Sequence, residues 1–211
     1  MYRYFFKRLI DFTLSLIALP FFGIIFIILA PIIFLTDRGP VFYNALRLGK
    51  NGKVFKMYKF RSMRVNAPDI RNKDGSTYNG EDDPRVTWIG RIMRKTSLDE
   101  VPQLLNVLNG DMSIIGPRPF VTTHYYGYDK LEPKMKKRIS VRPGITGYSQ
   151  AYFRNSISQD EKIEKDCYYA DHASFALDIK IFFQTVKSVL MHKNIYVSDE
   201  IKADAKGKVR Q

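Results

Sequence analysis

The sequence has 211 residues, of which 45% are hydrophobic and 14% aromatic, and this suits one folded domain with its own core. Its formal net charge of +13 at pH 7 requires an anionic partner, namely a nucleic acid, an acidic membrane surface or a phosphorylated substrate. The single cysteine excludes an intrachain disulfide, and the three histidines lie too far apart in sequence to match a zinc-binding motif.

The first predicted element is an apolar membrane segment. Between Phe12 and Leu35 the sequence contains no charged residue, and about 18 or more apolar residues in a row are long enough to enter a bilayer. A cleaved signal peptide has a shorter apolar stretch of about 7–15 residues, followed by a small-residue cleavage motif. We therefore expect residues 1–36 to form a membrane helix that the mature protein keeps.

The charges beside this segment bear on its topology. Basic residues precede it and follow it, and basic flanks favour the cytoplasmic side of a membrane. A helix that enters the bilayer and returns to the same face satisfies both flanks, and Pro20 is the expected position of the break, since proline removes a backbone donor. A single straight span that tolerates Pro20 and Pro31 is the alternative. The flanking basic residues are Arg3, Lys7, Arg8, Arg38, Arg47 and Lys50.

The rest of the sequence predicts a cytoplasmic catalytic or binding domain over residues 37–197, followed by a charged tail over residues 198–211. The predicted fold class is α+β: a helix-rich monotopic membrane protein with a re-entrant helix and interfacial amphipathic helices. Strands are expected at residues 41–44 and 53–60, an exposed polar loop at 66–85, and helices at 103–109, 161–172 and 177–193.

Residues 87–95 have the pattern of an amphipathic helix, for which two interpretations remain open. The helix lies in the membrane interface, or it packs its apolar face against the core of the domain. The apolar face carries Trp88, Ile89, Ile92 and Met93, and the basic face carries Arg91, Arg94 and Lys95.

The stretch Thr96–Gln103, with the sequence TSLDEVPQ, holds two adjacent carboxylates. Ser97 and Glu100 have the spacing of a capping box, which predicts that a helix begins here. In one interpretation Asp99 and Glu100 only complement the helix dipole. In the other, Asp99 is an ionised nucleophile and Glu100 holds a divalent metal.

Several cations surround this stretch in sequence. Lys59 and Arg61 alternate along an expected strand, so both point to one side. Arg118 in GPRP and Arg142 in VRPG each stand beside prolines, which fix the backbone and reduce the entropy lost on binding. Such arginines suit the bidentate capture of a phosphate group, whereas most exposed charges serve only solvation.

Six sequence blocks follow one another in a specific order. They are KRLIDFTLS, DRGPVFY, GKVFKMYKFRSM, RKTSLDEVPQLLNVLNGDMSIIGPRP, VRPGITGYSQ and DCYYADHASFALDIKI. Over residues 2–197 they resemble the bacterial sugar transferase family, the monotopic polyprenol-phosphate phosphoglycosyl transferases, and the short length resembles the minimal members with only a catalytic domain. One departure is that the family often breaks its membrane helix at a Ser-Pro pair, which would align with Gly23 and Ile24.

The resemblance implies an enzyme on the cytoplasmic face of the bacterial inner membrane, among its phospholipids. It would transfer a sugar 1-phosphate from a UDP-sugar to a polyprenol (undecaprenyl) phosphate and release UMP, as the first membrane step of glycoconjugate assembly. Asp99 matches the nucleophile that forms an aspartyl-phosphosugar, and Glu100 the metal-associated carboxylate, with Mg²⁺ held by Asp99 and Glu100. The donor is expected to contact Lys59, Arg61, Arg118, Arg142, Gln150 and Asp166.

Two other functions fit part of the pattern. A non-catalytic, basic, membrane-anchored binding protein would account for the charge and the apolar segment, but not for the Asp99–Glu100 pair. A nucleic-acid-binding protein would account for the charge alone, since no nucleic-acid-binding motif is present in the sequence.

Overall fold

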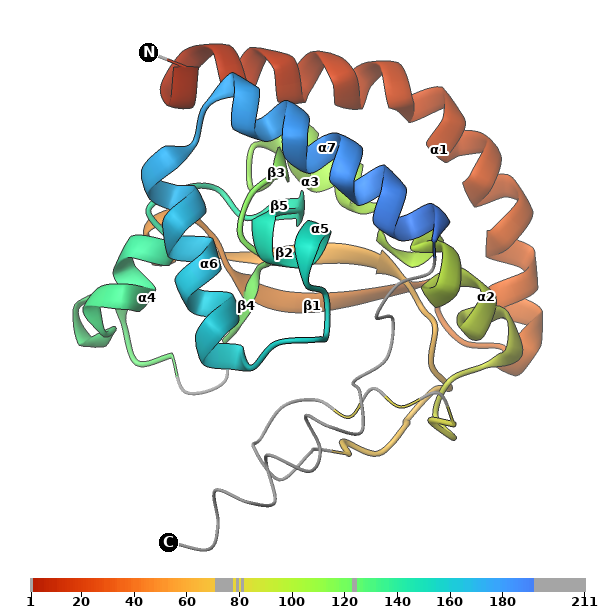
Figure 1. Cartoon of the computed structure of the whole chain (residues 1–211). Helices are drawn as coiled ribbons and strands as arrows, with labels where there is room; N and C mark the ends of the chain where they lie inside the picture. The colour runs from red at the N-terminus through yellow and green to blue at the C-terminus, as the bar shows by residue number, and fades with distance from the viewer. Residues whose placement is uncertain (1, 71–77, 79, 81, 123–124, 192–211) are drawn as a thin grey trace, which may run out of the picture.

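The computed structural model describes residues 2–70, 78, 80, 82–122 and 125–191. A helix of 31 residues, α1 (Lys7–Asp37), runs around the outside of a domain of mixed helices and strands, and a π-helical turn (Tyr2–Phe6) precedes it (Figure 1). The predicted tail over residues 198–211 lies outside the described residues.

Helix α1 contains both prolines and remains helical through them. The helix is not interrupted at Pro20, where a break is expected, and its axis curves along its length (Figure 1). Proline removes one hydrogen bond and crowds the preceding turn, which bends a helix without ending it when both halves are held by other contacts. By length and composition α1 can cross a membrane, and only 11% of its most apolar stretch is buried within the structure. That exposed apolar surface indicates membrane association.

A network of buried polar side chains holds the N-terminal end of α1 to the domain. The Lys7 ammonium lies 2.6 Å from a carboxylate oxygen of Asp178 in the last long helix. The buried Asp11 carboxylate accepts hydrogen bonds from the Ser113 hydroxyl at 2.6 Å and the Ile114 amide at 3.1 Å. Burying a charged group removes it from water at a cost in free energy. The ion pair and the hydrogen bonds compensate that cost here.

The C-terminal end of α1 is attached to the same domain. The Arg61 guanidinium pairs with Asp37 at 2.7 Å and donates to the carbonyl oxygen of Ile33 at 3.3 Å. Leu29 and Ile33 of α1 also pack in a hydrophobic cluster of the domain, whose other buried members are Phe60, Ile89 and Met93. Both ends of α1 therefore rest on one domain.

Two small sheets form the centre of that domain. In the first, β1 (Phe42–Leu48) pairs antiparallel with β2 (Val54–Phe60) and with β4 (Phe120–Val121), in the order β2-β1-β4. In the second, β3 (Ser113–Ile115) pairs parallel with β5 (Gly144–Thr146). The strands predicted at residues 41–44 and 53–60 are confirmed as this hairpin.

Helices surround the sheets (Figure 1). Those predicted at residues 103–109, 161–172 and 177–193 correspond to α3, α6 and α7, although residues 192 and 193 lie outside the described part of the chain, and the α+β class is confirmed. The short helices α4 and α5 are not predicted by the sequence, because few residues of either are apolar at helical spacing. The helices are α2 (Trp88–Thr96), α3 (Gln103–Asn109), α4 (Pro133–Arg138), α5 (Tyr148–Tyr152), α6 (Gln159–His172) and α7 (Phe175–Leu190).

Helix α2 divides its apolar residues between two environments. Ile89 and Met93 are buried in the core, whereas Trp88 and Ile92 are 60% and 48% exposed. The core-packing interpretation of residues 87–95 is thus confirmed for half of the apolar face. The other half is an exposed apolar surface of the kind that suits a membrane interface.

The loop predicted at residues 66–85 is not exposed throughout. Asp83 and Arg85 are buried and form an ion pair with a closest distance of 2.7 Å. Arg85 also donates to the carbonyl oxygens of Pro68, at 3.2 Å, and Tyr78, at 2.9 Å. A buried guanidinium needs several acceptors, and this one gathers them from the loop itself, so it closes the loop at its base.

The backbone of α2 lies in close contact with the chain just after the β-hairpin, at Gly90 and Ser62. A methyl group on Gly90 would lie 2.0 Å from the carbonyl oxygen of Ser62, which cannot move aside because it is backbone. Gly90→Ala is therefore expected to cost about 1–3 kcal/mol of stability. Gly23→Ala is the matched control, since nothing lies within 4 Å of its added methyl group. Thermal unfolding in detergent measures both, and equal melting temperatures for the two variants would contradict the prediction.

Candidate active site

The two adjacent carboxylates lie on a tight turn between α2 and α3. Ser97 has a left-handed backbone (φ 60°) and ends α2 by donating its amide to the carbonyl oxygen of Met93. The predicted capping box is therefore wrong: an N-cap requires an extended backbone, and Ser97 makes no side-chain cap. A 3₁₀ turn (Leu98–Glu100) follows, and α3 begins only after Pro102.

Lys59 of β2 joins the two carboxylates. Its ammonium lies 3.2 Å from an oxygen of Asp99 and 2.9 Å from an oxygen of Glu100. Arg118, from the loop between β3 and β4, reaches the same Glu100 oxygen at 3.2 Å. The structure thus brings together four residues that the sequence had assigned to one site, from segments far apart in the chain.

The charges of this cluster stabilise one another. Burial by itself would raise the pKa of Glu100, but Lys59 and Arg118 outweigh it and lower that pKa to about 2. The charge of Glu100 in turn raises the pKa of Arg118. Glu100 therefore stays ionised at any physiological pH. Asp99 is 7% exposed, and its carboxylate contacts the ammonium group of Lys59.

Arg61 occupies a different place from Lys59. Its guanidinium contacts Asp37 and the carbonyl oxygens of Ile33 and Met63, so it holds the end of α1. Arg61 stands just after β2, where the chain leaves the hairpin, and the alternation that put it beside Lys59 no longer applies. The structure does not bring it to the acidic pair.

Arg142 also lies outside the cluster. Its Nε donates to the carbonyl oxygen of Gly110 at 2.9 Å, at the C-terminal end of α3. Arg8 of α1 donates to the neighbouring carbonyl oxygens of Val107 and Leu108. The carbonyl groups at a helix C-terminus attract cations, which accounts for both arginines as caps of α3.

Gln150 and Asp166 are turned toward the interior. The Gln150 amide donates to the carbonyl oxygen of Ile145 at 3.2 Å. Asp166 is 1% exposed and accepts hydrogen bonds from Arg138, at 2.8 Å, and from the hydroxyl of Ser149, at 2.7 Å. Neither side chain makes a hydrogen bond or an ion pair with Asp99 or Glu100.

The glycines of the GPRP and VRPGITG motifs bring two backbones together. A methyl group on Gly116 would lie 2.4 Å from the carbonyl oxygen of Arg142, and one on Gly147 would lie 2.0 Å from that of Gly116. The absence of a side chain at these glycines therefore lets one loop pack directly on the other.

Sequence reasoning missed two arginines. Arg154 has a left-handed backbone (φ 50°), and its guanidinium lies 3.4 Å from the hydroxyl of Ser97. Burial lowers the pKa of Arg154 and the charge of Glu100 opposes that shift, so Arg154 lies within electrostatic reach of the acidic pair. The other arginine, Arg138, stands in the lysine-rich run KMKKR, where nothing in the sequence distinguishes it.

Asp99 and Glu100 are also the carboxylates available to a metal at this turn. Within the described ranges no group of three or more His, Cys, Asp or Glu side chains could hold a metal ion. A magnesium ion accepts such a site, since it keeps several waters and uses one or two carboxylates together with substrate phosphates.

Comparison with known proteins identifies the family. Residues 2–192 match the family described as bacterial sugar transferase. The chain is 44% identical to the galactosyl transferase CpsE of Streptococcus agalactiae, over 88% of this chain and 42% of that protein. It is 40% identical to the uncharacterized sugar transferase EpsL of Bacillus subtilis, over 94% of each.

A third relative is named UDP-N-acetylgalactosamine-undecaprenyl-phosphate N-acetylgalactosaminephosphotransferase, from Aeromonas hydrophila. It is 39% identical over 88% of this chain and 44% of its own length. The chain therefore spans less than half of two of these relatives and nearly all of EpsL. The match over residues 2–192 includes the Lys59–Asp99–Glu100–Arg118 cluster, and the chain belongs to the bacterial sugar transferase family.

Proposed function

We propose that the protein transfers a sugar 1-phosphate from a UDP-sugar to undecaprenyl phosphate or a related polyprenol phosphate. The observation that carries the proposal is the pair of adjacent carboxylates that Lys59 joins, with Arg118 on Glu100, in a domain bound to an apolar helix. The name of the Aeromonas relative includes both a UDP-sugar and undecaprenyl phosphate. The reaction is the first membrane step of bacterial glycoconjugate assembly.

In the first half of the reaction, a carboxylate oxygen of Asp99 attacks the β-phosphorus of the UDP-sugar. A bond forms between that oxygen and the phosphorus, the bond to the bridging oxygen breaks, and UMP leaves with the electron pair. The product is an aspartyl-phosphosugar. Lys59 suits this step, because its ammonium orients Asp99 in the resting state and balances charge on the donor as the bond breaks.

In the second half, a phosphate oxygen of the polyprenol phosphate attacks the same phosphorus. The acyl-phosphate bond breaks, the Asp99 carboxylate returns and a polyprenol diphosphate sugar is released. Arg118 has a half-exposed side chain, 53% accessible, so it offers donors to an incoming phosphate while it remains paired with Glu100.

Mg²⁺ is the proposed cofactor. Asp99 and Glu100 present hard oxygen ligands on one turn, and Glu100 remains ionised because of its cationic neighbours. When bound, the ion supplies Lewis-acid neutralisation of the pyrophosphate charge. The residues of the chain orient the donor and the nucleophile.

The proposed topology is monotopic, on the cytoplasmic face of the inner membrane. A straight helix of this length would extend about 1.5 Å per residue, more than enough to cross a hydrocarbon core of about 30 Å. To cross, however, α1 would have to pull Lys7 away from Asp178 or Asp37 away from Arg61. A re-entrant α1 keeps both buried contacts. The exposed apolar residues of α2 and α7, among them Trp88, Phe182 and Phe183, then meet the lipid interface.

The nucleophile assignment predicts that Asp99→Asn lowers the rate of UMP release by roughly a thousandfold or more, since the amide is no nucleophile. The measurement is UMP release from a panel of UDP-sugars by purified protein in detergent, with the intact mass showing a phosphosugar adduct for the wild type only. Asp111→Asn is the control, because Asp111 pairs with the exposed Lys53 at the surface. More than a few per cent of activity in Asp99→Asn would contradict the assignment. No UMP release by the wild type would favour the non-catalytic binding protein.

The cofactor assignment predicts that exhaustive EDTA treatment stops UMP release and that Mg²⁺ restores it, whereas Zn²⁺ does not. The physical reason is that carboxylate and phosphate oxygens are hard ligands. Glu100→Gln should lose most of its activity and recover little of it at high Mg²⁺. Full activity of the EDTA-treated protein would rule out a divalent ion.

The topology predicts that the N-terminus lies on the cytoplasmic side. A cysteine placed at Arg3 in a Cys167→Ser background should react with an impermeant thiol reagent only after spheroplasts are lysed. A cysteine at Lys134, which is 68% exposed on the domain, serves as the matched cytoplasmic control. Labelling at position 3 in intact spheroplasts, with position 134 unlabelled, would establish a straight span.

A further inference from the structure

The loop that carries Arg118 begins at Gly116, whose amide donates to the carbonyl oxygen of Thr146 at 2.8 Å. Pro117 and Pro119 have no backbone N–H, so the loop anchors itself mainly through carbonyl oxygens. The Gly144 amide donates to the carbonyl oxygen of Pro117 at 2.9 Å. The carbonyl oxygen of Arg118 itself accepts from Nη2 of Arg138 at 2.9 Å. The contact from Arg138 is the one closest to the side chain that reaches Glu100.

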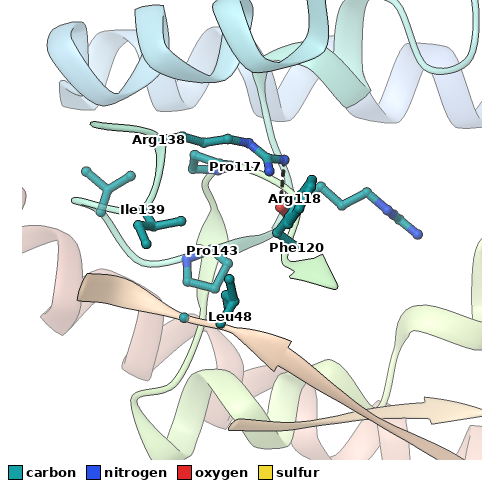
Figure 2. A pocket seen from close by; sticks show the side chains of 9 residues that line it. Leu48, Pro117, Arg118, Phe120, Arg138, Ile139 and Pro143 are labelled. Carbon is teal, nitrogen blue, oxygen red and sulfur yellow. Dashed lines mark hydrogen bonds between the residues drawn. The ribbon is translucent and has the colours of Figure 1, made fainter. Parts of the chain in front are cut away.

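The Arg118 loop packs closely on the VRPGITG loop at Gly116, and a small hollow borders its other residues. The hollow lies between the loop, the end of β1 and Pro143, and Figure 2 shows Pro117, Phe120 and Ile139 around it. The side chain of Arg118 extends away from this hollow, while its carbonyl group points to Arg138 (Figure 2). Beside this hollow, a directional hydrogen bond from Arg138 fixes the carbonyl group of Arg118, in addition to the backbone packing at Gly116.

Arg138 is itself held rigidly. It is 6% exposed, and its guanidinium binds Asp166 through Nε and Nη2, both at 2.8 Å. The Ser149 hydroxyl fixes the other oxygen of Asp166 at 2.7 Å. The guanidinium also lies over the ring of Phe120, 5.2 Å from its centre. A chain of contacts therefore runs from α5 and α6, through Arg138 of α4, to the carbonyl group of Arg118.

The arrangement is not the best one for stability alone. Nη1 of Arg138 is buried and finds no hydrogen-bond partner among the residues that the structure describes. A buried donor without a partner carries a desolvation cost, and an apolar pair would avoid that cost. The planar guanidinium can bind Asp166 and the carbonyl group of Arg118 at the same time in a fixed geometry. An apolar pair could not do this.

We propose that Arg138 is a positioning residue for the reaction: it holds the carbonyl group of Arg118 so that the Arg118 guanidinium meets Glu100 and the donor phosphates. Asp166 orients Arg138 and so acts one step further away. This inference rests on the proposed phosphoglycosyl transfer, and it assigns to Asp166 a supporting role in place of donor contact.

The test is a double-mutant cycle on kcat/KM for UMP release. Arg138→Lys keeps the charge and loses the fork, and we expect it to lower kcat/KM about tenfold or more, as small misplacements of catalytic groups do. In an Arg118→Ala background the same substitution should change kcat/KM by less than about twofold, since the group that it positions is gone. Equal losses in both backgrounds would overturn the proposal.

Lys137→Met is the matched control. Lys137 is the neighbouring residue on α4 and pairs with Asp171 of α6 at 2.6 Å, but both side chains are about half exposed. It links the same two helices without touching the loop, so its kcat/KM should equal that of the wild type. A loss in Lys137→Met as large as that in Arg138→Lys would mean that any weakening between α4 and α6 suffices, and would overturn the specific role of Arg138.

A second variant covers the case in which Arg138→Lys does not fold. The double change Arg138→Met and Asp166→Leu replaces the buried ion pair with apolar side chains of similar volume, which proteins often tolerate. Hydrogen exchange at the amides of Arg118 and Phe120 should be faster in this variant, with the Gly144–Thr146 amides unchanged. Unchanged exchange at Arg118 and Phe120 would overturn the proposal. This readout needs no turnover, so a wild type that releases no UMP would refute the proposed function and leave this result standing.

Discussion

The shared ammonium group of Lys59 is the contact on which the arrangement of the site depends. Two carboxylates on adjacent residues repel each other, and a turn that buries Asp99 and partly buries Glu100 would be unstable without a cation between them. Lys59 comes from the central β-hairpin, and Arg118 approaches Glu100 from the other side. The charges therefore join the hairpin, the α2–α3 turn and the GPRP loop into one site, and they keep Glu100 ionised.

The two ends of helix α1 are bound to the same elements that carry the residues of the site. Asp11 of α1 accepts a hydrogen bond from Ser113, at the start of β3, and β3 leads directly into the loop that carries Arg118. At the other end of α1, Arg61 follows the strand that carries Lys59. In the proposed reaction, the UDP-sugar and the polyprenol phosphate each have to reach Asp99. The contacts at both ends of α1 attach the apolar helix to the elements that carry Asp99, Lys59 and Arg118.

The basic residues of the motifs fall into three physical groups. Lys59 and Arg118 meet the acidic pair, Arg8 and Arg142 cap the C-terminal end of α3, and Arg61 holds the end of α1. Only the first group faces the proposed chemistry directly. A strongly basic composition thus reflects the assembly of a membrane-bound domain as much as the binding of phosphate.

The sequence alone predicts those elements that depend on residues close together in the chain. The apolar run predicts a membrane helix, alternation predicts the β-hairpin, and Gly110 ends α3 because it adopts φ 86° without steric cost. The TSLDEVPQ motif located the acidic pair. Tertiary structure decided the rest, because pairing partners come from distant segments: Arg61 turns to Asp37, Asp166 to Arg138, and Ser97 adopts a left-handed backbone that no capping box allows. Sequence spacing specifies which side of an element a residue occupies, but only the folded chain determines which charged residue it meets on that side.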